Sequence, residues 1–127
     1  MRPTYTYKVT GVRVVDGDTI EADVDVGFGV VLHKQMFRLF GINAYETRRG
    51  SWTKQLPQSV VEMRLKLGKM AKDCLIHMVE QAEMCTIATV PSINKGKYGR
   101  WLAVLYVDNL DWNNHVIEQG WGVEAFY

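Results

Sequence analysis

The chain lacks the residue patterns that are typical of disulfide frameworks, zinc sites and membrane spans. Its only two cysteines, Cys74 and Cys85, form no C-x-x-C pair, so we expect buried free thiols rather than a disulfide or zinc. The three histidines are scattered, with no pair at metal-ligand spacing. No apolar run approaches membrane-spanning length, and no secretory hydrophobic segment opens the sequence. We therefore expect a cytoplasmic protein with no membrane partner.

The chain also has little net charge, at +1, so global charge alone does not predict a polyanionic partner. The distribution of charge is more informative. Residues 16–25 include five acids and no base, whereas residues 47–72 include seven bases and one acid. An acidic site beside a basic segment fits a cation-dependent enzyme acting on a nucleic-acid backbone, although a solvated helix face would give the same basic run.

With 127 residues, the sequence has room for one domain, 1–127, and 47% apolar residues are enough for a core. Alternating apolar residues predict strands, and one apolar stripe at helical spacing predicts the clearest helix. Five strands with a helix inserted after the third suggest an α+β, mostly β fold, a five-stranded Greek-key barrel of the OB type with two helices. We expect strands over 5–15, 20–26, 30–42, 84–90 and 100–107, either a loop or a loop leading into early helix over 47–67, and helices over 68–82 and 112–119.

A turn with two carboxylates, Asp16-Gly17-Asp18, lies between the first two expected strands. Asp and Gly tolerate turn dihedrals, so this segment is first of all a hairpin signal. However, Asp18 opens a strand that carries further acids, and converging carboxylates repel one another unless a cation offsets their charge. Calcium takes about six to eight oxygen ligands. Asp18, the side-chain oxygen of Asn43, a carbonyl near Ala44 and water held by Glu46 could provide them.

Two arginines lie in or at the start of strands. Arg38 stands within an apolar strand, where it is either an outward-facing residue or a rigid donor aimed at a phosphate. Lys97-Tyr98-Gly99-Arg100 enters a later strand, with Tyr98 as a hydroxyl donor and Gly99 allowing close approach of the backbone. Together with the acids, the arginines favour attack by water on a phosphodiester, with a metal ion and both guanidinium groups stabilising the transition state.

In their order along the chain, these motifs resemble those of the staphylococcal nuclease family, and the similarity covers nearly the whole sequence. Residues 14–20 are similar to its first metal motif. Phe37-Arg38-Leu39 and Asn43-Ala44-Tyr45-Glu46-Thr47 look like its arginine strand and its D-x-P-E-T segment. Lys97-Tyr98-Gly99-Arg100 resembles its second arginine motif, and residues 68–82 its first helix.

The resemblance implies an OB-fold barrel, a Ca2+ cofactor and hydrolysis of DNA and RNA, with the 5′-oxygen leaving. Asp18 and Asn43 would then ligate the ion, with Asp16 in support, and Glu46 would orient or deprotonate the attacking water. We expect the protein to act as a monomer on DNA, RNA or both. The remaining implied roles are contact with the phosphate by Arg38 and Arg100, and contact with the nucleotide by Tyr98 and Lys97.

Three positions depart from the family pattern. Asn43 replaces the second metal-ligating aspartate, which keeps an oxygen ligand but removes a negative charge, so we expect weaker calcium binding or a shifted metal preference. Tyr45 stands where the family has proline, so we expect the loop that holds Glu46 to be less rigid. Residues 47–67 form a longer segment than usual.

Two other functions remain open from the sequence. Asn43 is also what a domain that kept the fold but lost its metal would show, and such a domain would bind nucleic acid or protein without cleaving. An interaction module for methylated or proline-rich peptides ranks last, because no aromatic cage is recognisable in the sequence.

Overall fold

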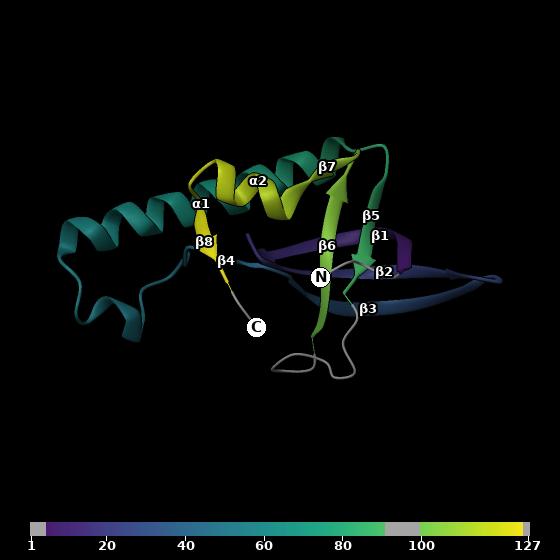
Figure 1. Cartoon of the computed structure of the whole chain (residues 1–127), viewed down its shortest axis with the longest axis horizontal. Coiled ribbons are helices and arrows are strands. Elements are labelled where there is room, and N and C mark those ends of the chain that lie inside the picture. The colour runs from purple at the N-terminus through teal and green to yellow at the C-terminus, as the bar shows by residue number, and fades with distance from the viewer. Residues whose placement is uncertain (1–4, 91–99, 126–127) are drawn as a thin grey trace.

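The computed structural model describes residues 5–90 and 100–125 (Figure 1). Its main sheet has the strand order β3-β2-β1-β5-β6-β7, and β3 also pairs in parallel with β6. That last pairing closes five strands into a barrel, which confirms the predicted OB-type fold. The elements are β1 (Tyr5–Asp16), β2 (Thr19–Gly27), β3 (Val30–Leu39), β4 (Ile42–Ala44), η1 (Ser51–Thr53), α1 (Gln58–Gln81), β5 (Cys85–Thr89), β6 (Trp101–Val107), β7 (Leu110–Asp111), α2 (Trp112–Glu118) and β8 (Gly122–Glu124).

The barrel encloses one apolar core, built by the inward residues of each alternating strand. Ile20, Phe37, Leu39 and Leu105 are at most 2% exposed and come from β2, β3 and β6. Helix α1 adds Leu75 to this core, together with partly buried neighbours on the stripe that the sequence predicted. None of the helices in the described ranges is long and apolar enough to cross a membrane.

The expected strand over 30–42 is wrong at its end, because the chain makes a turn at Phe40 and Gly41. Gly41 has a φ of +84°, a left-handed conformation that ends the strand and that glycine adopts without a Cβ clash. The three residues of β4 then leave the barrel and pair antiparallel with β8, in a separate two-stranded sheet. An uninterrupted apolar run, Leu39-Phe40-Gly41-Ile42, conceals this break in the sequence.

Helix α1 begins at Gln58, ten residues before the predicted start at 68, so of the two alternatives for 47–67 the structure has the loop that leads into helix. Pro57 precedes the first helical residue, where the missing N–H of proline costs nothing. Its first turns extend beyond the barrel (Figure 1). The shorter helix α2 begins as predicted, with the Asp111 side chain accepting a hydrogen bond from Asn114 N at 2.9 Å.

Both cysteines are free thiols, as predicted, with Cys85 buried and Cys74 partly buried. Burial raises the pKa of the Cys74 thiol above its ordinary value. Burial, followed by the nearby charge of Asp108, raises the pKa of the Cys85 thiol as well.

Candidate active site

The turn Asp16-Gly17-Asp18 is held from below by a buried tryptophan. Trp112 is fully buried, and its Nε1 donates a hydrogen bond to the carbonyl of Gly17 at 2.8 Å. A Cβ added at Gly17 would lie only 3.0 Å from the Cβ of Ala44 and 3.1 Å from that of Ala71. The turn is therefore packed tightly between β4 and α1, which fixes where Asp18 leaves it.

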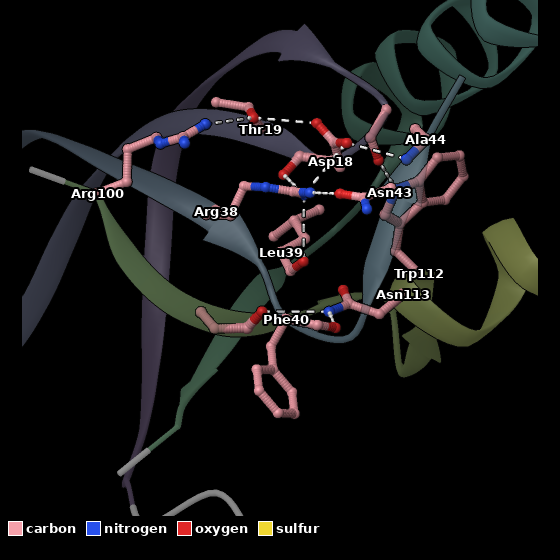
Figure 2. Close-up of polar contacts among 12 residues, drawn as sticks. Asp18, Thr19, Arg38, Leu39, Phe40, Asn43, Ala44, Arg100, Trp112 and Asn113 are labelled. Atoms are coloured by element: carbon pink, nitrogen blue, oxygen red, sulfur yellow. Dashed lines mark hydrogen bonds and ion pairs between the residues drawn. The ribbon is translucent and has the colours of Figure 1, made fainter. Parts of the chain in front are cut away.

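Asp18, Arg38 and Asn43 form one cluster, as the sequence predicted for three site residues (Figure 2). Arg38 Nη1 lies 3.1 Å from Asp18 Oδ2, and the two side chains are only 12% and 15% exposed. The Arg38 Nη2 group donates to the Oδ1 atom of Asn43. Arg38 also donates to the backbone carbonyls of Asp18 and Leu39, at 3.3 Å and 3.5 Å. Both Nη groups of Arg38 are therefore bonded to acceptors within the protein.

Residues 43–46 are held between two close-packed glycines. A Cβ at Gly68 of α1 would lie 2.4 Å from the carbonyl oxygens of both Tyr45 and Glu46. On the other side, a Cβ at Gly122 of β8 would lie 2.4 Å from the carbonyl oxygen of Asn43. Since any side chain at either position would collide with backbone, these two glycines set the position of the segment that carries Asn43 and Glu46.

Hydrogen bonds hold the same segment. Ala44 N donates to Asp18 Oδ2 at 2.9 Å, which ties β4 to the start of β2. Tyr45 N donates to the carbonyl of Trp121 at 2.9 Å. Proline, which has no N–H, could not form this bond, so tyrosine at this position gives the loop an attachment of its own.

One cleft, with a volume of about 410 Å³, brings most of the predicted acidic and amide residues together. Glu46 and Asn43 are exposed there, and Asp16 and Asp18 are partly buried. Asp16 accepts a hydrogen bond from Thr47 Oγ1 at 3.1 Å. We call this cavity the acidic cleft, and its described lining residues are Asp16, Asp18, Asn43, Ala44, Tyr45, Glu46, Arg64 and Val123.

The side chains of the acidic cleft that could ligate a metal ion would all do so through oxygen atoms. Such ligands suit a hard cation such as calcium. Within residues 5–90 and 100–125, no three His, Cys, Asp or Glu side chains gather into a group that could hold a metal. An ion in this cleft would therefore need the amide oxygen of Asn43 and further oxygens from backbone or water, beside the Asp18 carboxylate.

The remaining predicted residues lie around this cluster or outside the described ranges. Arg100, at the start of β6, reaches Asp18 through Thr19: its Nη1 is 3.5 Å from Thr19 Oγ1, which donates to Asp18 Oδ1 at 3.1 Å (Figure 2). Neither Arg38 nor Arg100 is among the described residues that line the acidic cleft. Lys97 and Tyr98 fall outside the residues that the structure describes.

Sequence reasoning missed three residues that build or line the site. Arg64 lines the acidic cleft from the part of α1 that precedes the predicted helix start at 68. The hydrogen bond from Trp112 to the turn gave no signal in the sequence. Buried Asn113 joins β6 to the turn after β3, accepting from Leu105 N at 3.1 Å and donating to Phe40 O at 2.8 Å. The only signal in the sequence was the position of Asn113 next to Trp112 in the predicted helix.

Among the comparisons with known proteins, a match to a family model identifies the family. The family model described as staphylococcal nuclease homologue matches residues 36–127, which include Arg38, Asn43, Glu46 and Arg100. Strands β1 and β2, and the turn between them that carries Asp16 and Asp18, lie before the matched region. No match was found among curated proteins. Because the match spans well over half of the sequence and the barrel agrees with it, the chain belongs to the family of staphylococcal nuclease homologues.

Proposed function

We propose that this protein is a calcium-dependent nuclease that hydrolyses phosphodiester bonds of DNA, RNA or both with little sequence specificity. The observation that carries the proposal is the convergence of Asp18, Asn43 and Glu46 on one cleft, with Arg38 bonded to Asp18 and Asn43. The family supports a nuclease-type or nucleic-acid-binding domain in general. Calcium, catalysis and the individual roles are our inference.

In this proposal, Asp18 and Asn43 hold the ion through their side-chain oxygens, with Asp16 in support. When bound, calcium would act as a Lewis acid on a phosphoryl oxygen. Glu46, exposed in the cleft, orients the attacking water and accepts its proton. The water oxygen forms the new bond to phosphorus, the bond to the 5′-oxygen breaks, and that oxygen leaves and takes up a proton from solvent. Arg38 and Arg100 supply positive charge near the phosphoryl group as its negative charge grows, and Tyr98 and Lys97 contact the nucleotide.

A second candidate, binding of nucleic acid without cleavage, is favoured by one contact. The Arg38 guanidinium already neutralises Asp18 at 3.1 Å and bonds to Asn43, the two side chains that would hold the ion. An incoming cation must compete with this internal cation, and it gains only an amide at Asn43 where a carboxylate would attract it more strongly.

A calcium-titrated cleavage assay on single-stranded DNA and RNA separates the two candidates. We expect cleavage by the wild type that chelator abolishes, and a loss of at least about 100-fold in Arg38→Ala combined with Arg100→Ala. Asn43→Asp should lower the calcium concentration needed for half-maximal cleavage, whereas Glu80→Gln, exposed on α1, is the control and should not change the rate. A wild type no faster than the double variant refutes the nuclease. Chelator-insensitive binding with no cleavage by Asn43→Asp would support the second candidate.

A further inference from the structure

The guanidinium group of Arg64 differs from that of Arg38 in what surrounds it. Arg38 is bonded to Asp18, to Asn43 and to two backbone carbonyls, so its N–H groups already have acceptors inside the protein. Arg64 lines the acidic cleft from the second turn of α1, and it contacts an aromatic ring instead. Its Cζ lies 5.4 Å from the centroid of the Tyr45 ring.

Stacking on the Tyr45 ring fixes the position of Arg64 while leaving its charge available. A guanidinium over a ring face is attracted by the π-electrons, and its N–H groups point outward in the guanidinium plane, where they can bond to phosphate. Among the described residues, Arg64 forms no ion pair with a carboxylate. A half-buried cation that forms no ion pair with the described carboxylates thus lies at the wall of the cleft that carries Asp18 and Glu46.

A second cavity, lined by both acidic and basic side chains, shares Asp16 and Glu46 with the acidic cleft. Its volume is about 250 Å³, and it is also lined by Val15, Thr47, Arg48 and Lys72. Positive side chains therefore lie on both sides of Glu46: Arg64 in one cavity, and Arg48 and Lys72 in the other. A strand with several phosphates could place one phosphate beside Arg64 and another beside Arg48 and Lys72.

We propose that Arg64, positioned by Tyr45, binds a backbone phosphate of a single-stranded nucleic acid on one side of the acidic cleft, while Arg48 and Lys72 bind the strand on the other. The substrate class is therefore a polynucleotide strand rather than a small phosphodiester. This inference rests on the proposed function for the identity of the site, but it concerns binding and is tested without cleavage. It also gives Tyr45 a role that the family's proline could not have.

The test measures the affinity for fluorescently labelled oligothymidylate and oligouridylate of about 16 nucleotides, a length that covers the site of one OB fold. Chelator is present throughout, so cleavage plays no part. Affinity is followed by anisotropy over a series of salt concentrations. The variants are Arg64→Gln and Arg64→Lys, with Lys66→Gln as the matched control. Lys66 is exposed, lies two residues along the same helix and lines neither cavity, since positions i and i+2 face different directions.

We expect Arg64→Gln to weaken binding about tenfold and to lower the slope of log affinity against log salt by about 0.7, as for one lost phosphate contact on a single strand. Arg64→Lys should keep the salt slope and recover part of the affinity, and Lys66→Gln should match the wild type. Tyr45→Phe, which keeps the ring, should bind as the wild type, and Tyr45→Leu should bind about two- to fivefold more weakly.

Equal affinities and salt slopes for Arg64→Gln and Lys66→Gln would overturn the inference, as would a wild type that binds neither oligonucleotide. Neither result depends on whether the wild type cleaves in calcium. A wild type that fails to cleave but loses affinity through Arg64→Gln would refute the nuclease and leave the binding role of Arg64 supported. A preference for one of the two oligonucleotides would identify DNA or RNA as the source of the strand.

Discussion

Replacing Gly68 by alanine tests whether the close approach of α1 really sets the position of Glu46. At an open helical position, glycine to alanine stabilises a protein by about 1 kcal/mol, because alanine has the higher helix propensity. At Gly68 the added Cβ would lie 2.4 Å from the Tyr45 and Glu46 carbonyl oxygens and 2.8 Å from the Glu46 carbonyl carbon. Helix propensity predicts that Gly68→Ala raises the free energy of unfolding, whereas the close contacts predict that it lowers it. The sign of the measured change therefore decides between them.

The geometry gives the size of the effect. Ordinary contacts begin at 3.4 Å, so α1 and the Tyr45–Glu46 segment must separate by 1.0 Å, which is 3.4 Å minus 2.4 Å. Overpacking that forces backbone shifts costs about 1–3 kcal/mol, which exceeds or cancels the gain in propensity. We therefore expect Gly68→Ala to be less stable than the wild type by as much as about 2 kcal/mol. If the protein is a nuclease, misplacing Glu46 by this distance should lower its rate about 100-fold.

Urea denaturation, followed by the tryptophan fluorescence of the protein, measures the stability, and the calcium-dependent cleavage assay measures the rate. Glu80→Ala, at an exposed position of the same helix, is the control and should change the unfolding free energy by less than about 0.5 kcal/mol. A Gly68→Ala protein that is more stable than the wild type by about 1 kcal/mol would show that the helix has room there, and the argument for the glycine contacts would be wrong.

Two further predictions concern the support of the turn and the cysteines. Trp112→Phe removes the buried donor to the Gly17 carbonyl, so we expect a loss of about 1–3 kcal/mol in unfolding free energy by urea denaturation. Trp52→Phe, which removes an exposed bond to the Arg48 carbonyl, should cost less than about 0.5 kcal/mol, and equal costs would contradict this reasoning. Because burial raises the pKa of Cys85, less of its thiol is ionised at a given pH, and iodoacetamide at pH 8 should modify it far more slowly in the native protein than in urea. Equal rates in the two conditions would show that Cys85 is accessible.

Features with a local cause were predictable from the sequence. Strict alternation gave β1 and β2, and Asp111 followed by helical spacing gave the start of α2. Asp18, Arg38 and Asn43 were identified as site residues from their motifs and from the family resemblance, and the structure brings their side chains together. Whether they bind calcium and catalyse is still a prediction.

Features that depend on distant parts of the chain were not predictable. The turn at Gly41 lies in an apolar run, and β4 is a strand only because β8 pairs with it. The early start of α1 was not predicted, because Pro57 is typical of a loop. The sequence does not show the contacts that the first turn of the helix makes. Arg64 was missed for the same reason, since only the longer helix brings it over Tyr45.

The pairing of β4 with β8 has a consequence for when the protein becomes functional. Asn43 lies opposite Val123, so its strand has no partner until residues 122–124 are available, whereas the barrel needs nothing beyond β6 to close. During synthesis, the N-terminal parts of a domain emerge and collapse first. A nascent chain would thus complete its barrel while β4, the strand of Asn43, still lacked its partner β8. Any activity that needs Asn43 in place would arise only after residues 122–124 had left the ribosome.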